Sequence, residues 1–353
     1  MERRSFLKRC VGAAALLLPL SKPMRTARAA EPAADAEPGD REERMKTTIL
    51  SFFCDDTSPW RAPPSAFGDF LDYVRAEAIA GESSVILALG SGGRVLSEPR
   101  SDAERIYIEQ LQRACACGID SHMEVMTHGR RYDFRTRTIP PDAPYEGLWM
   151  HEPEVPAAEY EEYFEDIIAE GAKIGVRFTG LTWPGGGGPE AAARYAELRR
   201  QGATNLSANC WRALLNVARR GGFRGPTVPC FVHRRGLAEC MAAEGEFGVY
   251  DMPVIGEDRL GRWENSPAHV DPDYYITADG QGGRIAEYIR KGAPYCLFHA
   301  HWQGLNPADG VGWDAFRLVV ARIREFHEER VAWMRPSELT DHLHKQRSAK
   351  DER

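Results

Sequence analysis

Short apolar runs alternate along the chain with longer segments in which apolar residues recur every three or four positions. The apolar runs, rich in β-branched and aromatic residues, are typical of buried strands; they occupy Thr48–Cys54, Ser84–Leu89, Ile119–Met126, Ile174–Leu181, Thr227–Val232, Val249–Ile255, Pro294–His301 and Val331–Met334. The segments between them have the spacing of amphipathic helices; the clearest occupy Ala66–Ala80, Asp102–Cys117, Ala157–Ala172, Ala208–Arg219, Ile285–Lys291 and Trp313–Glu328. This alternation predicts parallel strands covered by helices, in an α/β fold that is most simply a barrel.

The stretches outside this pattern set the limits of the predicted domain. No linker rich in Gly, Ser or Pro interrupts residues 46–346, a length that fits one α/β domain of barrel size. Residues 347–353 are polar, and we expect them to be a disordered tail. Residues 30–45 are charged and rich in Pro and Ala, so we expect a flexible leader.

The first 29 residues have the three parts of a cleavable signal peptide. A basic start is followed by the apolar run Val11–Leu20 and by the small-residue site Ala27-Arg-Ala29. The pair Arg3-Arg4 with Phe-Leu-Lys after it resembles a twin-arginine signal. We therefore expect the twin-arginine export machinery as a partner, and a periplasmic or extracellular mature protein. The apolar run is too short to span a bilayer, so no integral membrane association is expected.

Charge and cysteine content argue against a nucleic-acid-binding protein and against a fold built on a zinc knuckle or a disulfide framework. Without residues 1–29 the chain has 38 Lys and Arg against 51 Asp and Glu, a net charge of −13. A field of that sign disfavours nucleic acid as a partner. The seven remaining cysteines are irregularly spaced and form no recognisable zinc knuckle or disulfide framework.

Two adjacent carboxylates mark the end of the first predicted strand. Asp55 and Asp56 follow the apolar run directly, and Ser-Pro comes next. Neighbouring acids repel each other, so the pair costs stability unless something compensates. A cation held by one acid, with the other serving as a base, supplies that compensation; two solvated acids at a strand end are the alternative.

A second polar cluster follows the third predicted strand. It contains His122, Glu124 and His128. On a straight strand the two histidines lie roughly 20 Å apart, too far to share an ion. If the chain coils after the strand, Glu124 and His128 come within about 6 Å of each other. We therefore expect Glu124 and His128 as metal ligands, with His122 as the reserve.

The late apolar run ends in His299 and His301, which lie two residues apart and hence on the same side of an extended strand. A histidine at a strand tip near an activated water is suited to act as a general acid. Trp60, Trp183 and Trp302 each follow one of the candidate segments. Their rings, with His301, are candidate substrate-binding groups because aromatic faces stack on sugar rings; ordinary packing is the alternative.

Taken together, these segments resemble the polysaccharide deacetylase (NodB homology) family over roughly residues 46–346. The resemblance implies a distorted parallel (β/α) barrel of about seven strands, a divalent ion (zinc foremost), and hydrolysis of acyl groups on a carbohydrate substrate. It implies that Asp55 is the general base, Asp56 and His128 are metal ligands, and His299 protonates the leaving group. The closing stretch from Val331 to Leu339 resembles the family's last strand and helix.

The chain also departs from the family pattern. Glu124 occupies the place of the first of two ligand histidines, a change that shifts metal preference toward manganese or cobalt. The arginine that orients the base is missing, with Arg177 nearby, and Asp251 is the candidate for its aspartate partner. Two alternatives therefore stand beside an active deacylase. One is an inactive carbohydrate-binding protein; the other is a different metal hydrolase, with an amide or phosphate substrate, on the same barrel.

Overall fold

The computed structural model describes residues 47–63, 65–89, 93–185, 188–200, 206–232 and 236–351. The predicted signal peptide and leader lie outside these residues. The strands are β1 (Thr48–Thr57), β2 (Gly81–Val85), β3 (Ala88–Leu89), β4 (Arg94–Val95), β5 (Ile119–Met123), β6 (Gly180–Thr182), β7 (Thr227–Phe231), β8 (Glu239–Glu244), β9 (Phe247–Asp251), β10 (Tyr295–His301) and β11 (Val331–Trp333). The α-helices are α1 (Ala66–Ala76), α2 (Asp102–Ala114), α3 (Glu146–Trp149), α4 (Ala157–Lys173), α5 (Gly188–Arg200), α6 (Ala208–Arg219), α7 (Arg284–Arg290), α8 (Trp302–Leu305), α9 (Trp313–His327) and α10 (Pro336–Asp351).

One large sheet runs through the domain in the order β10-β1-β2-β5-β6-β7-β9-β8, with β11 beside the start of β1. Every pair from β10 to β9 is parallel, which makes seven parallel strands in a row; only β8 is antiparallel. The sheet is strongly curled, so that segments far apart in the strand order meet. The backbone N–H of Ile255, just after β9, donates to the carbonyl of Leu297 in β10 at 2.8 Å. The predicted α/β fold with a parallel, barrel-like sheet is confirmed.

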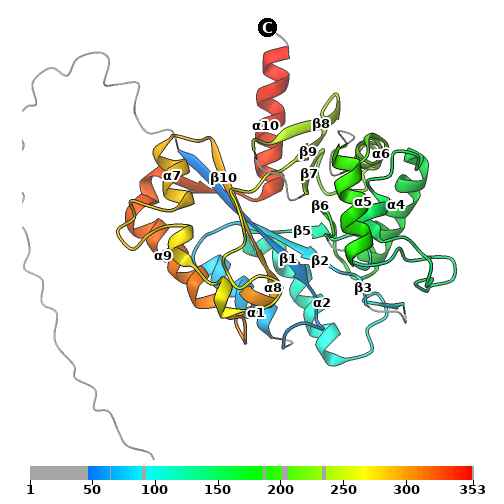
Figure 1. Ribbon diagram of the computed structural model, residues 1–353, viewed down its shortest axis with the longest axis horizontal. Coiled ribbons are helices and arrows are strands. Elements are labelled where there is room, and N and C mark those ends of the chain that lie inside the picture. The colour runs from blue at the N-terminus through cyan, green and yellow to red at the C-terminus, as the bar shows by residue number, and fades with distance from the viewer. Residues whose placement is uncertain are drawn as a thin grey trace, which may run out of the picture. The chain divides into compact units, whose positions relative to one another are not determined.

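The two faces of the curled sheet carry different side chains. Leu50, Phe52 and Cys54 of β1 belong to the large apolar cluster that packs against the surrounding helices. Phe53 belongs to a smaller cluster with Phe231 and other residues of β7, β9 and β10. Because successive strand residues alternate in direction, the second set lines the inside of the curl. Figure 1 shows α4, α5 and α6 at the right of the view, toward one end of the curled sheet, and α7 and α9 at the left, toward the other end.

Several boundaries differ from those predicted. The strand expected at Ile174–Leu181 is shorter and is β6, Gly180–Thr182. The residues before it form the turn that leaves α4, in which Gly175 has a φ of +74°. The strand expected from Ser84 begins at Gly81 instead. The strand pair β8 and β9 contains an antiparallel strand, β8, that the pattern did not predict, because its sequence Glu-Cys-Met-Ala-Ala-Glu lacks an alternation of apolar and polar positions and none of its residues is buried.

The predicted disordered tail is also wrong for most of its length. Helix α10 continues to Asp351. It packs on β7, where Thr340 shares a hydrogen bond with Thr227 at 2.9 Å. None of the helices among the described residues is long and apolar enough to cross a membrane.

Candidate metal centre and catalytic cavity

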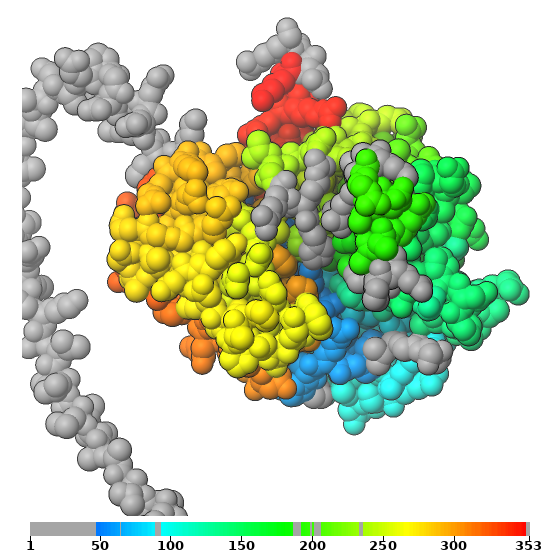
Figure 2. Space-filling model, viewed as in Figure 1, coloured from blue at the N-terminus to red at the C-terminus, as the bar shows by residue number. Residues whose placement is uncertain are grey.

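A cavity of about 670 Å³ opens at the carboxyl ends of β1, β5 and β10. In parallel α/β folds this end of the sheet is where ligands bind. The cavity is lined mainly by polar and charged side chains: Asp55, Asp56, Arg61, Glu124, His128, Glu257, Asp258, Arg262, Trp263, His299, His301 and Gln303. Figure 2 shows the segment after β9, drawn yellow, next to the blue start of the domain on the face in view.

An irregularity in β1 turns both adjacent carboxylates toward this cavity. In a regular strand Asp55 and Asp56 point to opposite faces. Here the register between β1 and β2 shifts between Cys54 and Thr57, and Asp56 has a φ of +70°. A bulge of this kind re-aims a side chain, so both acids line the cavity.

Asp56, Glu124 and His128 each present one donor atom to a common point. The Nε2 atom of His128 lies 3.2 Å from Oδ1 of Asp56 and 3.2 Å from Oε1 of Glu124. The three donor atoms all lie within 4.8 Å of one another. The two carboxylates are buried, and the His128 side chain is 25% exposed toward the cavity. Proximity of Glu124 and His128, predicted from their spacing, is thus present, although a turn produces it instead of a helix.

The second oxygen of each carboxylate is held by the protein. Arg61 Nη1 and Gln303 Nε2 donate to Oδ2 of Asp56 at 3.0 and 2.7 Å. The hydroxyl of Ser84 and the backbone N–H of Asp56 donate to Oε2 of Glu124 at 2.6 and 2.8 Å. These contacts leave Oδ1 and Oε1 to face His128. Oriented ligands with a hydrogen-bonded outer shell are characteristic of metal sites.

The donor set fits a divalent cation. Two ligands about 2.1 Å from one ion stand roughly 3.2 Å apart when they subtend about 100°. Three acceptor atoms at such separations need a proton or a cation between them, and Oδ1 of Asp56 has no hydrogen-bond donor within the described part of the chain. Two carboxylates and one imidazole suit zinc, manganese or cobalt.

The turn that carries His128 is fixed by a buried glutamate. Glu146 accepts hydrogen bonds from the backbone N–H groups of Met126 and Thr127, at 3.1 and 3.0 Å, and from the Thr127 hydroxyl at 3.0 Å. The hydroxyl of Tyr163 donates to Oε1 of Glu146 at 2.6 Å, the same oxygen that accepts from Met126. His128 follows directly, with a φ of +52°. Unusual backbone angles persist only where the surroundings enforce them, and Glu146 supplies that constraint.

Asp55 is the one acid of the pair that lies outside the ligand group. It is 2% exposed and lines the cavity beside Asp56. Burial raises the pKa of Asp55 well above its ordinary range; His301 opposes this, and the neighbouring carboxylates Glu124 and Asp56 add to it. A carboxylate with a raised pKa is suited to accept a proton near neutral pH.

The two late histidines have different surroundings. Nδ1 of His301 lies 2.8 Å from Oδ2 of Asp258, which also accepts the backbone N–H of His301 at 3.1 Å. Burial lowers the pKa of His301, but the bond to Asp258 and nearby carboxylates outweigh it and raise the pKa to about 9. Burial lowers the pKa of His299 to about 4. At neutral pH His301 therefore holds a proton that His299 lacks.

Three of the residues predicted as reserve or orienting groups lie away from the cavity. His122 is fully buried inside the curl, with Nδ1 3.7 Å from Glu82, and does not join the ligand group. Arg177 precedes β6 and lines a separate cavity near the amino ends of the strands. Asp251 is buried at the end of β9 and does not line the cavity that contains Asp55 and Asp56. Asp258, further along the same segment, takes the place beside the histidine.

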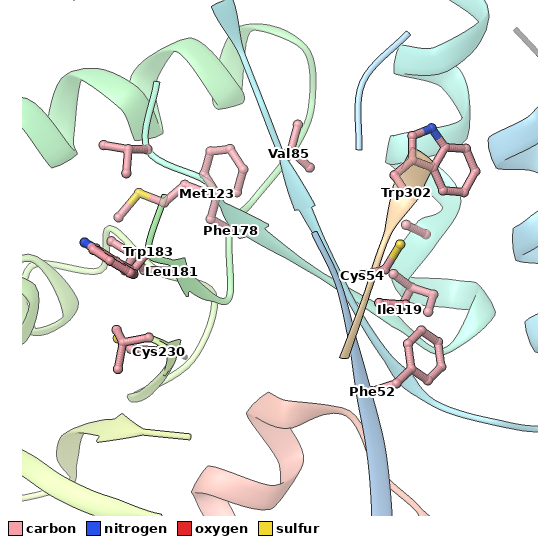
Figure 3. Packing of buried hydrophobic residues seen from close by; sticks show 14 of the residues in the cluster. Phe52, Cys54, Val85, Ile119, Met123, Phe178, Leu181, Trp183, Cys230 and Trp302 are labelled. Atoms are coloured by element: carbon pink, nitrogen blue, oxygen red, sulfur yellow. The ribbon is translucent and has the colours of Figure 1, made fainter. Parts of the chain in front are cut away.

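The predicted stacking tryptophans belong largely to the core. Trp302 is 1% exposed and Trp183 is 5% exposed; Figure 3 shows both among buried apolar side chains. Trp60 is half-buried and donates to Oε1 of Glu104 at 3.0 Å. None of the three lines the cavity that contains Asp55 and Asp56. His301, the fourth predicted substrate group, does line it.

Sequence reasoning missed Arg61, Gln303, Asp258, Glu146 and Trp263. Arg61 and Gln303 lie within a few residues of candidates already chosen, so proximity in sequence was an available signal. Asp258 stands in a loop and Glu146 begins the four-residue helix α3, neither with a periodic pattern, and their roles depend on contacts between distant segments.

Comparison with known proteins gives distant likenesses. No family model matches the chain. The major capsid protein of Salmonella phage ViI is 29% identical over 147 residues, which cover 38% of this chain and 29% of that protein. The chain thus spans less than a third of that relative's length.

Among solved structures, a T48 deacetylase with substrate is 11% identical, with 83% of this chain and 90% of that chain covered and a TM-score of 0.39. A GH20 β-N-acetylhexosaminidase from Streptomyces coelicolor A3(2) is 11% identical, covering 82% and 72%, with a TM-score of 0.36. A GH113 β-1,4-mannanase is 12% identical, covering 79% and 99%, with a TM-score of 0.28. The function of this chain is therefore inferred from its own site.

Proposed function

We propose that the protein is an exported, metal-dependent hydrolase that removes acyl groups, acetyl foremost, from a carbohydrate. The observation that carries the proposal is the convergence of Asp56, Glu124 and His128, whose donor atoms lie within 4.8 Å of one another. Asp55 and the pair His301–Asp258 line the same cavity. A ligand group, a base and a protonated histidine are the parts that metal-assisted acyl hydrolysis requires.

Asp56, Glu124 and His128 would hold the ion. A divalent cation supplies Lewis-acid activation of water and of an acyl carbonyl. Arg61 and Gln303 keep Asp56 oriented by binding its second oxygen, as Ser84 does for Glu124. Arg61 thus places a guanidinium beside the ligand aspartate, whereas the family pattern places one beside the base.

The proton transfers fall to side chains of this chain. Asp55 accepts the proton of the attacking water, since its raised pKa makes it a stronger base than an exposed carboxylate. His301 donates a proton to the departing amine or alcohol, and Asp258 fixes its ring and tautomer through Nδ1. His299, which the family resemblance nominates as the acid, is neutral at pH 7 and lines the cavity beside His301.

Metal content and acyl release test the proposal together. The purified mature protein should contain about one divalent ion per chain, and it should release acetate from acetylated sugars. A chelator should abolish release, and zinc, manganese or cobalt should restore it. Asp55→Asn should retain the ion and lose turnover. Release that persists after complete removal of the ion would overturn the proposal.

The alternatives give other results in the same assay. A protein that binds metal and glycans, but releases no acyl group from any of them, is a binding protein on this barrel. Release from small amides alone identifies a different amide hydrolase. The complete His301–Asp258 pair favours turnover over binding alone, because a buried protonated histidine is costly to maintain without a use.

A further inference from the structure

Four buried polar side chains that the proposed mechanism does not use form a polar layer inside the curled sheet. They come from β1, β2, β5 and β6, which are adjacent in the sheet (Figure 1), and they are Ser51, Glu82, His122 and Thr182. Each of these residues is 0% exposed. Within the described part of the chain, no hydrogen-bond partner exists for the two carboxylate oxygens, the two ring nitrogens or the two hydroxyl oxygens of this layer. Buried polar atoms are costly unless they are hydrogen-bonded, so the layer requires a partner of another kind.

The sheet register places these side chains inside the curl. Glu82 pairs in register with Phe53, and the ring of His122 lies 6.1 Å from the ring of the same phenylalanine. Thr182 pairs in register with Phe231. Both phenylalanines belong to the inner cluster, where their ring centroids lie 4.5 Å apart. Because side chains alternate along each strand and register partners share a face, the polar layer also faces inward.

The layer lies directly beneath the ligand group. Ser84 follows Glu82 by two residues on β2, and Glu124 follows His122 by two residues on β5. Successive inward side chains on a strand are about 7 Å apart. The hydroxyl of Ser84 donates to Oε2 of Glu124 at 2.6 Å and accepts the backbone N–H of Asp56 at 3.0 Å. Ser84 thus connects the polar layer to two of the three ligands.

The fold makes room for the ring of His122. Gly180, on β6, is the register partner of this histidine. A Cβ on Gly180 would lie 2.5 Å from Nε2 of His122 and 2.3 Å from the carbonyl oxygen of Pro229. Glycine inside a strand is typical of such a close approach. The neighbouring strand therefore has no side chain where the imidazole lies.

The chemistry of the layer fits water better than a metal ion. Nδ1 of His122 lies 3.7 Å from Oε2 of Glu82, which is too long for a direct hydrogen bond, and neither residue joins the ligand group. Burial raises the pKa of Glu82 well above its ordinary range, and the carboxylates of Asp55 and Glu124 add to it. A carboxylic acid, an imidazole and two hydroxyls offer both donors and acceptors. Buried water typically occupies polar sites that offer it two to four such partners.

We infer that the polar layer binds a small cluster of internal water molecules, which positions Ser84 and, through it, the ligand Glu124. A serine hydroxyl has one donor and two acceptor positions. The contacts of Ser84 with Glu124 and Asp56 use the donor and one acceptor, so the second acceptor can take a hydrogen bond from water below. Glu82 and His122 supply four of the six unpartnered atoms and are the positioning residues. This inference rests on the proposed function and deepens it.

Stability and ion binding should respond in opposite directions when the layer is made apolar. Replacing a buried polar pair by apolar residues of similar volume is often neutral or stabilising. Glu82→Leu/His122→Leu should therefore unfold in urea at the wild-type midpoint or above it. The same variant should bind zinc about tenfold more weakly, as for other losses in the outer shell of a metal site. A layer that served the fold alone would instead lower the urea midpoint.

The test combines zinc calorimetry with urea unfolding of the purified protein. Glu82→Gln/His122→Gln, whose amides still bind water, should keep most of the affinity that the leucine variant loses. Ser83→Ala is the matched control and should bind zinc as the wild type does. Ser83 is buried beside Glu82, and its hydroxyl also lacks a partner among the described residues, but it pairs in register with Cys54 of the outer cluster. Wild-type zinc affinity in the leucine variant, a lower urea midpoint or failure of that variant to fold would overturn the inference.

A crystal structure of the wild type separates this inference from the proposed function. If the wild type binds zinc and the leucine variant binds it as tightly, the inference fails alone. If the wild type binds no zinc, the proposed function fails, and the layer is judged by its electron density. Ordered water within hydrogen-bond distance of both Glu82 and His122 supports the layer. A direct hydrogen bond between these two side chains, with no water between them, contradicts it.

Discussion

Two buried glutamates, Glu104 and Glu124, show how the surroundings of a carboxylate separate a structural role from a chemical one. Glu104, at the start of α2, accepts the backbone N–H groups of Arg100 and Ser101 at 2.6 and 2.9 Å. It also accepts the indole N–H of Trp60 and pairs with Arg94 at 2.6 Å. Both of its oxygens are thus used.

Glu124 is equally buried, but its contacts are divided. One oxygen accepts Ser84 and a backbone N–H, while the other faces Asp56 and His128 across a space that a cation would fill. The pKa values move in opposite directions as a result. Burial raises the pKa of Glu124 well above its ordinary range; for Glu104 burial acts the same way, but the donors outweigh it and lower the pKa to about 2. A buried carboxylate that receives hydrogen bonds on both oxygens from the protein stabilises the fold. One that directs an oxygen at a cavity can instead bind an ion or a ligand there.

The largest expected effect is on turnover. Asp55→Asn keeps the shape of the base and removes its ability to accept a proton. We expect kcat to fall by about 10³-fold, within the range for loss of a general base. The measurement is acetate release at saturating substrate, with metal content determined on the same sample. Glu104→Gln is the matched control, since it changes a buried carboxylate without touching the cavity; comparable losses in both variants would remove the distinction drawn above.

The next effect concerns the general acid. His301→Gln should lower kcat about 10²-fold, and His299→Gln should lower it less, because His299 carries no proton at neutral pH. Activity should decline as pH rises through about 9, where His301 loses its proton. A cation bound nearby would shift this decline to a lower pH. Asp258→Asn removes the carboxylate that raises this pKa, so its declining limb should move to lower pH. A pH profile that is the same in Asp258→Asn and the wild type would exclude His301 as the acid.

A smaller effect is expected on metal affinity. Glu146→Ala frees the turn that carries His128, and we expect metal binding to weaken 10- to 100-fold, as for other outer-shell partners. Glu146→Gln keeps one carbonyl acceptor and should recover part of the loss. Titration with zinc measures both. Glu152→Gln, which alters a partly exposed ion pair with Arg194, is the control and should bind zinc as the wild type does. A wild-type Kd in Glu146→Ala would show that the turn keeps its conformation without Glu146.

The smallest effect is on stability alone. Glu104 has a folded-state pKa below its unfolded value, so its contribution is present above about pH 4.5 and is lost as pH falls toward 2. We expect Glu104→Gln to cost about 2 kcal/mol at pH 7, after discounting for the partly exposed Arg94, and progressively less below pH 4.5. Urea unfolding of both proteins between pH 3 and 7 measures it. A difference that grows as pH falls would contradict the assignment.

The sequence predicted the fold because the fold depends on periodicity. Strand and helix patterns located the parallel sheet, and the acids at the end of β1 and the cluster after β5 followed from the rule that chemistry lies at strand ends. Glu124 and His128 were predicted to lie together because their spacing permits only short distances once the chain turns.

The rest of the site depends on contacts that spacing does not encode. Asp258 and Trp263 lie in a loop without periodicity, whose course is set by glycine contacts and by Asn265. Trp302 and Trp183 follow the candidate segments in sequence, yet their rings point into the core. Which face a residue presents just after a strand depends on bulges and turns, as at Asp56, and these were not visible in the pattern.

The central claim is that Asp56, Glu124 and His128 bind one divalent ion. The most direct test is to titrate chelator-treated protein with zinc in a calorimeter, for the wild type, Asp56→Ala, His128→Ala and Glu257→Gln. Glu257 lines the same cavity but stands outside the ligand group. We predict one ion per chain for the wild type and Glu257→Gln, and affinity reduced at least 100-fold in the two ligand variants. Stoichiometric binding that is equally tight in all four proteins, or no binding by the wild type, would contradict the account.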